Sequence, residues 1–237
     1  MDKFSRTLTL KNSVFLGLSS MIGAGLFLNI APTAKVASYS LILGLIMASS
    51  LAFANASSSA QLARLYPETG GTYLYAKNVL GKIPSLIAGY SFIIGKSISC
   101  IAIALTLGNY MSPVYPEYSG IIVILIVTGI SYFGITKTVA IAKWFVYSLV
   151  GILLFYIISI TSSETFSIQI PITDGLTLKG FLLSSCIWFF AFTGYSRLAT
   201  FGEEVKNPEK IIPKAIFTGL GLTVLIYLSV SWTTLGI

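Results

Sequence analysis

Glycine interrupts two long apolar segments of this chain at points where a membrane helix would otherwise be continuous. The first stretch, 17–27, reads Gly-Leu-Ser-Ser-Met-Ile-Gly-Ala-Gly-Leu-Phe, and the second, 189–195, reads Phe-Phe-Ala-Phe-Thr-Gly-Tyr. An unwound backbone in a bilayer leaves polar groups without partners, so such breaks occur only where they are buried in protein or line a wet cavity. Paired breaks in two matching segments point to the binding site of a membrane transporter.

The composition requires membrane surroundings. The chain has 237 residues, of which 55% are hydrophobic and 10% are charged, whereas about 25% of the residues of a soluble domain are charged. Its apolar runs are long enough to cross a hydrocarbon core of ~30 Å, which takes about 20 residues. The expected fold class is therefore an all-α polytopic membrane protein.

The same composition excludes several kinds of chemistry. The chain contains no histidine, which excludes histidine-dependent triads, histidine-ligated metals and histidine proton relays. Cys100 and Cys186 both fall inside apolar spans, so they are interpreted as packing residues and not as a disulfide. The net charge of +7 is attributed to cytoplasmic loops and not to a nucleic-acid partner. No cofactor and no metal site is predicted.

Seven spans are predicted, at about 13–34, 38–62, 84–111, 119–135, 143–162, 180–201 and 213–235. Lysine and arginine are concentrated in the N-terminal segment and in the loops after spans two, four and six. This bias places the N-terminus in the cytoplasm of a multi-pass cell-membrane protein. The first span is expected to be a retained helix and not a cleaved signal peptide.

A polar loop divides the single membrane domain, 1–237, into two unequal parts. The turn signals Pro171 and Asp174-Gly175 lie in this outer loop, 163–178. Residues 1–162 would form a first repeat of five spans, and residues 179–237 a partial second repeat of two. Repeats with an odd number of spans have opposite topology, so spans one and six would correspond, and both carry a glycine break.

Three motifs together resemble the amino acid–polyamine–organocation (APC) superfamily of permeases. They are the stretch 21–27 (Met-Ile-Gly-Ala-Gly-Leu-Phe), the stretch 66–75 (Tyr-Pro-Glu-Thr-Gly-Gly-Thr-Tyr-Leu-Tyr) followed by Gly81, and the stretch 189–215. The resemblance covers Leu10 to about Leu235. It implies a leucine-transporter-type inverted-repeat fold, here the first five-helix repeat plus two helices of the second. Helices one, two, six and seven would form a moving bundle, and helices three and four part of a scaffold.

Members of this superfamily have two complete repeats, so the resemblance implies a truncated permease. A second chain that supplies the missing helices, or a homo-oligomer, is therefore expected as a partner besides the lipid bilayer and an amino acid or related amine substrate. A non-transporting remnant or half-subunit remains an alternative. An intramembrane enzyme is a remote one, because Lys96 would be the only base for its serines.

A helix break offers both halves of what a zwitterionic amino acid needs. Free N–H groups at the start of the outgoing half-helix suit a carboxylate, and free carbonyls at the end of the incoming half-helix suit an ammonium. The alternative is that the glycines only let a neighbouring helix approach. The predicted substrate-binding residues are Met21, Gly23, Ala24 and Gly25 in span one and Phe190, Thr193 and Gly194 in span six.

Four further residues are predicted to gate the site or to couple transport, namely Tyr90, Lys96, Tyr195 and Ser196. Tyr90, like Phe190, resembles a gating position of the superfamily, although packing or interface anchoring is the plainer interpretation. Lys96 is an intramembrane charge that should face the protein interior; it would carry a coupling proton or hold backbone carbonyls. Ser196 stands where many members have an acidic residue, which leaves coupling by protons or by exchange open.

Two loops add expectations about the cytoplasmic side. The glycines of the stretch 70–75 permit a tight turn before a short helix, with or without a role in an inner gate. The charged stretch 203–210 would form a solvated rim or pair with Arg64 or Lys77, and the last span would begin near Ile212. The leading functional hypothesis is a secondary amino acid transporter that works by alternating access, since no phosphate-binding loop of an ATP-driven pump is present.

Overall fold

The structure is a computed structural model that describes residues 6–23, 25–27, 29–30, 33, 40–163, 166–167 and 177–236. The elements within these ranges are α1 (Leu10–Met21), α3 (Ser40–Leu65), α4 (Gly71–Leu80), α5 (Lys82–Met111), α6 (Pro116–Tyr132), α7 (Ile135–Thr161), α8 (Leu178–Phe192), the 3-10 helix η1 (Thr193–Phe201) and α9 (Pro208–Leu235). The predicted all-α class is confirmed. Ala24 and the turn signals Pro171 and Asp174 lie outside the described residues.

Six helical segments among the described residues are long and apolar enough to cross a membrane. They are Leu10–Phe27, Ser40–Leu65, Lys82–Met111, Ile135–Thr161, Leu178–Phe201 and Pro208–Leu235. Helix α6 is apolar but has only 17 residues, which at ~1.5 Å per residue gives about 26 Å. The fourth predicted span is therefore a shorter helix that falls slightly below the thickness of a typical hydrocarbon core.

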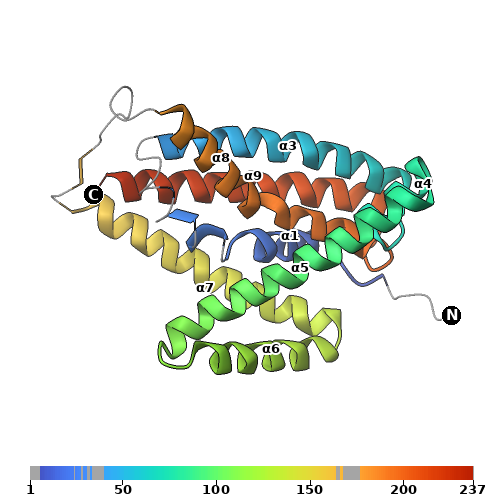
Figure 1. Cartoon of the computed structure of the whole chain (residues 1–237), viewed down its shortest axis with the longest axis horizontal. Coiled ribbons are helices and arrows are strands. Elements are labelled where there is room, and N and C mark those ends of the chain that lie inside the picture. The colour runs from blue at the N-terminus through green and yellow to red at the C-terminus, as the bar shows by residue number, and fades with distance from the viewer. Residues whose placement is uncertain are drawn as a thin grey trace.

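The bundle consists of α1, α3, α8 with η1, and α9, and α3 runs alongside α8 and α9 (Figure 1). Helix α3 faces these neighbours with a buried stripe of small side chains, Ala48, Ala52, Ala56, Ala60 and Ala63. Small residues let helix backbones approach closely, which is how helices associate in a bilayer without a hydrophobic driving force. At Gly44 the approach is so close that a Cβ atom would overlap the side chain of Ser184 on α8.

Helices α5, α6 and α7 lie outside this bundle, with α5 crossing it obliquely and α6 at the edge (Figure 1). The α5–α6 hairpin also depends on glycine, because a Cβ at Gly120 would lie 2.9 Å from the carbonyl oxygen of Ala104. Helix α4 begins at Gly71, and the φ angles of Gly70 and Gly71 are 139° and 51°. These left-handed values confirm the predicted glycine turn before a short helix.

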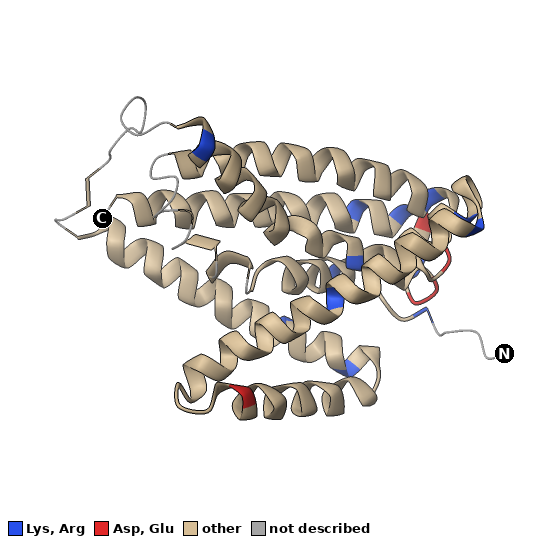
Figure 2. Ribbon diagram, in the orientation of Figure 1, with Lys and Arg blue, Asp and Glu red and all other residues tan. Residues whose placement is uncertain are grey.

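Lysine and arginine gather at the end of the molecule where α3 ends and α9 begins (Figure 2). Three loops meet there: the N–H of Leu8 donates to the carbonyl of Glu204 at 3.0 Å, and the N–H of Glu203 donates to Oγ1 of Thr69 at 3.3 Å. The pKa of the Glu204 carboxyl is raised, mainly because the group is buried and to a smaller extent because the Glu203 carboxylate lies nearby. Main-chain bonds thus hold these loops together, and among the described residues no ion pair joins Glu203 or Glu204 to Arg64 or Lys77.

Helix α9 begins at Pro208, earlier than the predicted start near Ile212. Asn207 takes a left-handed conformation with φ 44° and precedes a proline at the first helical position. Pro213 therefore lies inside the helix.

Candidate functional site

Helix α1 ends at Met21, and Ile22 is extended with φ −82° and ψ 104°. Helical backbone returns at Gly25, where the N–H of Leu26 donates to the carbonyl of Gly23 at 3.1 Å. The break predicted from the glycines of the first span is therefore present and falls at Ile22–Gly23.

The second break has a different geometry. Helix α8 ends at Phe192 and continues directly as η1 over nine residues. A 3-10 helix keeps its backbone hydrogen bonds but shortens their spacing to i→i+3. The sixth span is thus tightened at the predicted place and not unwound.

The two breaks touch each other through Gly194. A Cβ atom at Gly194 would overlap the main-chain carbonyl group of Ser20, one residue before the end of α1. Gly25 is similarly confined, since its Cβ would lie 2.9 Å from Cβ of Ala191 and 3.3 Å from Oη of Tyr227. For Gly25 and Gly194 the contacts are those of the helix-packing interpretation.

Gly23 is different because it faces open space. An added Cβ at Gly23 would meet no atom within 4 Å, and Gly23 lines a cavity of about 620 Å³ between the first span, α5 and α7. Among the described residues none accepts a hydrogen bond from the N–H of Gly23. The lining residues are Ser19, Ile22, Gly23, Phe27, Ile103, Thr106, Leu107, Tyr110, Phe145, Val146 and Leu149. A free main-chain donor therefore borders a mainly apolar cavity.

The main-chain carbonyls of Met21, Phe190 and Thr193, three of the predicted substrate-binding residues, each accept a side-chain hydroxyl. Tyr227 donates to Met21 at 2.5 Å, Thr193 to Phe190 at 2.8 Å, and Ser196 to Thr193 at 2.8 Å. A carbonyl oxygen has two lone pairs, so one further donor can still bind at each. The three carbonyls are partly satisfied and not vacant.

Tyr227 was missed by the sequence analysis. It lies on α9, fully buried, with its ring centroid 5.2 Å from those of Trp188 and Phe192 on α8. Packing or interface anchoring is the plain interpretation of an aromatic residue in an apolar span. Its position in the middle of the span is the signal that was available, because a buried tyrosine hydroxyl requires a partner.

Polar side chains of α7 contact the bundle both before and after the stretch of α7 that lines the cavity. On one side Nζ of Lys143 donates to Oδ1 of Asn12 at 2.6 Å, next to the paired rings of Phe15 and Tyr147 at 4.9 Å. On the other side Oη of Tyr156 lies 3.1 Å from Oγ1 of Thr234. These contacts bound the part of α7 that lines the cavity.

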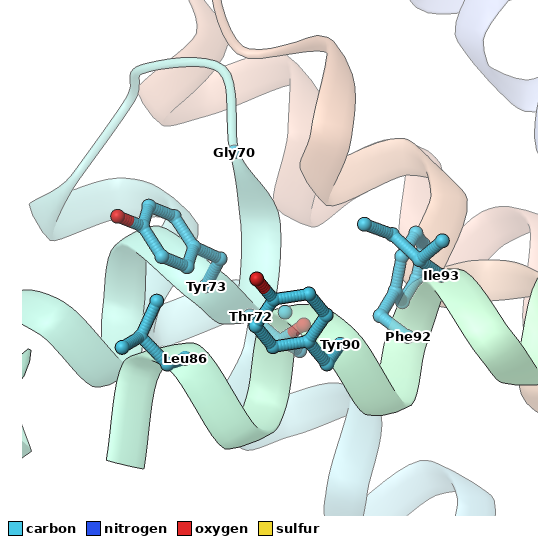
Figure 3. A pocket seen from close by; sticks show the side chains of 8 residues that line it. Gly70, Thr72, Tyr73, Leu86, Tyr90, Phe92 and Ile93 are labelled. Atoms are coloured by element: carbon cyan, nitrogen blue, oxygen red, sulfur yellow. The ribbon is translucent and has the colours of Figure 1, made fainter. Parts of the chain in front are cut away.

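The structure places Tyr90 away from the breaks. Its side chain is 65% exposed and lines a separate cavity of about 410 Å³ between α4 and α5. Figure 3 shows Tyr73 projecting from α4 and Tyr90 from α5 around this pocket. Along α5, Tyr90 precedes Ile103 of the first cavity by roughly 20 Å at ~1.5 Å per residue.

The other predicted gating and coupling residues, Lys96, Tyr195 and Ser196, line neither of the two cavities. Lys96 is half-buried, with Nζ 5.6 Å from the ring of Phe92, and lies close enough to Arg197 of η1 for their like charges to interact. Tyr195 is buried within reach of the Ser59 hydroxyl. Phe190 is 59% exposed. Within the described part of the chain no group of three or more acidic or cysteine side chains could hold a metal ion.

Comparison with known proteins assigns the family. The profile of the Amino acid permease family matches residues 12–235, so the chain belongs to this family of membrane transporters. An uncharacterised transporter of Mycobacterium tuberculosis is 39% identical over 231 residues, which cover 95% of this chain and 52% of the relative. The serine/threonine exchanger SteT of Bacillus subtilis is 26% identical, covering 94% and 53%.

A methylthioribose transporter of Bacillus subtilis is 24% identical, covering 98% of this chain and 55% of the relative. The chain thus spans about half the length of these relatives. The relatives and the family are transporters, so the remote alternative of an intramembrane enzyme is set aside.

Proposed function

We propose that the chain forms the substrate-binding part of a secondary amino acid transporter, with the ligand at the break of the first span. The observation that supports this most directly is the N–H of Gly23 beside the cavity, which has no acceptor among the residues that the structure describes. A main-chain N–H near the start of a half-helix is suited to a carboxylate, because the helix dipole adds to the hydrogen bond. The remaining lone pair of the Met21 carbonyl would accept from the ammonium.

An amino acid is proposed as substrate because the break supplies a donor and an acceptor close together. The exchanger SteT is named for serine and threonine, which makes an amino acid the first class to test. Alternating access would move the bundle against α5–α7, and the Lys143–Asn12 and Tyr156–Thr234 contacts would then open in turn. Exchange, or a proton carried by Lys96, would drive the cycle.

The partners and the orientation are also proposals. The repeat division at 163–178, with a second chain or a homo-oligomer completing the scaffold, would supply the part of the relatives that this chain does not span. The cluster of lysine and arginine at one end supports an N-terminus in the cytoplasm and a place in the cell membrane (Figure 2).

The proposal is tested with the purified full chain in nanodiscs and a panel of radiolabelled amino acids. Gly23→Leu fills the open space at the break, so binding should fall at least about tenfold, a loss of ~1.4 kcal/mol. Gly221→Leu on α9 is the matched control, because its added Cβ also meets nothing within 4 Å.

If Gly23→Leu binds amino acids with wild-type affinity, the break of the first span is not part of the binding site. If the wild-type chain binds no amino acid, either alone or in membranes that contain a complementing second half, the proposed function is wrong.

A further inference from the structure

We infer that Tyr227 is a positioning residue that fixes the geometry of the α1 break and thereby sets affinity there. The affinity part rests on the proposed function. The hydroxyl of Tyr227 donates to the carbonyl of Met21, the last residue of α1. The last carbonyls of a helix have no partner within the helix, and in this helix α9 provides one from outside.

Tyr227 contacts the chain on both sides of the break. Before the break it holds the Met21 carbonyl, and after the break its Oη lies 3.3 Å from the point where a Gly25 Cβ would stand. The intervening residues, Ile22 and Gly23, are those that border the cavity. The hydroxyl therefore fixes the start of the segment that carries the Gly23 N–H and lies close to the end of that segment.

Neighbouring residues leave the hydroxyl little freedom. The Tyr227 ring packs against Trp188 and Phe192, so it is held from the side of α8. One turn earlier on α9, Oγ1 of Thr223 lies 3.9 Å from Sδ of Met21, and a Cβ at Gly219 would lie 3.3 Å from Cε of the same methionine. Both the side chain and the carbonyl of Met21 are thus located by α9.

This bond differs from the two hydroxyl bonds at the second break. The bond from the Thr193 hydroxyl to the Phe190 carbonyl and the bond from the Ser196 hydroxyl to the Thr193 carbonyl each join residues three apart, and neither is fully buried. Tyr227→Met21 is buried and joins segments 206 residues apart. The local bonds constrain only their own segment, whereas the loss of the buried one leaves a polar group without a partner between two helices.

The test is Tyr227→Phe in the full chain, read by hydrogen exchange of the amides in 22–27 without ligand and by amino acid affinity. The ring packing stays and only the donor is lost. We expect exchange in 22–27 to become about tenfold faster and affinity to fall by about the same factor, as for one buried hydrogen bond. Tyr156→Phe, which removes the hydroxyl that contacts Thr234, should change neither.

Unchanged exchange in 22–27 of a folded Tyr227→Phe chain would overturn the inference, and so would a uniform rise across all bundle helices, which would indicate a general structural role. If exchange rises in 22–27 but the wild type binds no amino acid, the proposed function fails and the positioning of the break stands. If exchange rises and affinity is unchanged, the affinity part is wrong.

A second variant covers the case in which Tyr227→Phe does not fold. 3-Fluorotyrosine at 227 keeps the ring and strengthens the hydroxyl as a donor, so exchange in 22–27 should become slower than in the wild type. Equal or faster exchange in that chain would contradict the inference.

Discussion

The breaks in the first and sixth spans carry the same sequence signal and have different physical outcomes. At the first break the backbone leaves the helix, Gly23 opens onto a cavity, and a hydroxyl from a distant helix holds the freed carbonyl. At the second break the helix tightens to η1, two of its carbonyls also accept hydroxyls from the same segment, and Gly194 packs closely against α1. The first break thus opens onto a cavity, and the second packs against the helix end that precedes the first.

The largest expected effect comes from Gly194→Ala. The new Cβ would overlap the main-chain carbonyl of Ser20, and neither backbone can move without separating η1 from α1. We expect the free energy of unfolding to fall by about 1–3 kcal/mol, the usual cost of overpacking. Thermal unfolding of the purified chain in detergent measures this, with Gly23→Ala as the control that has open space.

Equal melting temperatures for Gly194→Ala and Gly23→Ala would remove the contrast between a packed and an open glycine.

That contrast marks the limit of what the sequence could predict. Apolar length and glycine position located the helices and both breaks, because these signals are local. The distinction between Gly23 and Gly25 depends on Ala191 and Tyr227, which come from distant segments. Tyr90 was placed near the site by resemblance, although it lines another cavity.

An intermediate effect is expected from Gly25→Ala. Its Cβ would lie 2.9 Å from Cβ of Ala191 and 3.3 Å from Oη of Tyr227. Both neighbours must therefore shift slightly to accommodate it. A loss of about 1 kcal/mol in the free energy of unfolding is expected. Adding Ala191→Gly removes the shorter contact and should recover part of this loss in the same thermal measurement.

No recovery in the double variant would mean that Cβ of Ala191 is not what confines Gly25, since Cα of Ala191 would still lie 3.0 Å from the new Cβ. Full recovery of stability with weakened amino acid binding would instead show that Gly25 also contributes to the binding site. Gly25 and Gly23 would then not differ in function as their packing suggests.

The smallest effects are expected from Thr193→Val and Ser196→Ala at the second break. Each substitution removes a hydroxyl that donates to a carbonyl within the same segment. The Phe190 carbonyl also accepts from the main-chain N–H of Thr193, so it keeps a partner when the hydroxyl is removed. Changes in the free energy of unfolding should therefore stay within ~0.5 kcal/mol, as for ordinary surface substitutions.

Amino acid affinity of Thr193→Val and Ser196→Ala should stay near that of the wild type, in contrast to Tyr227→Phe. If Thr193→Val weakens binding as strongly as Tyr227→Phe, the carbonyls of the sixth span contact the ligand through a geometry that the hydroxyl maintains, and both breaks form the site.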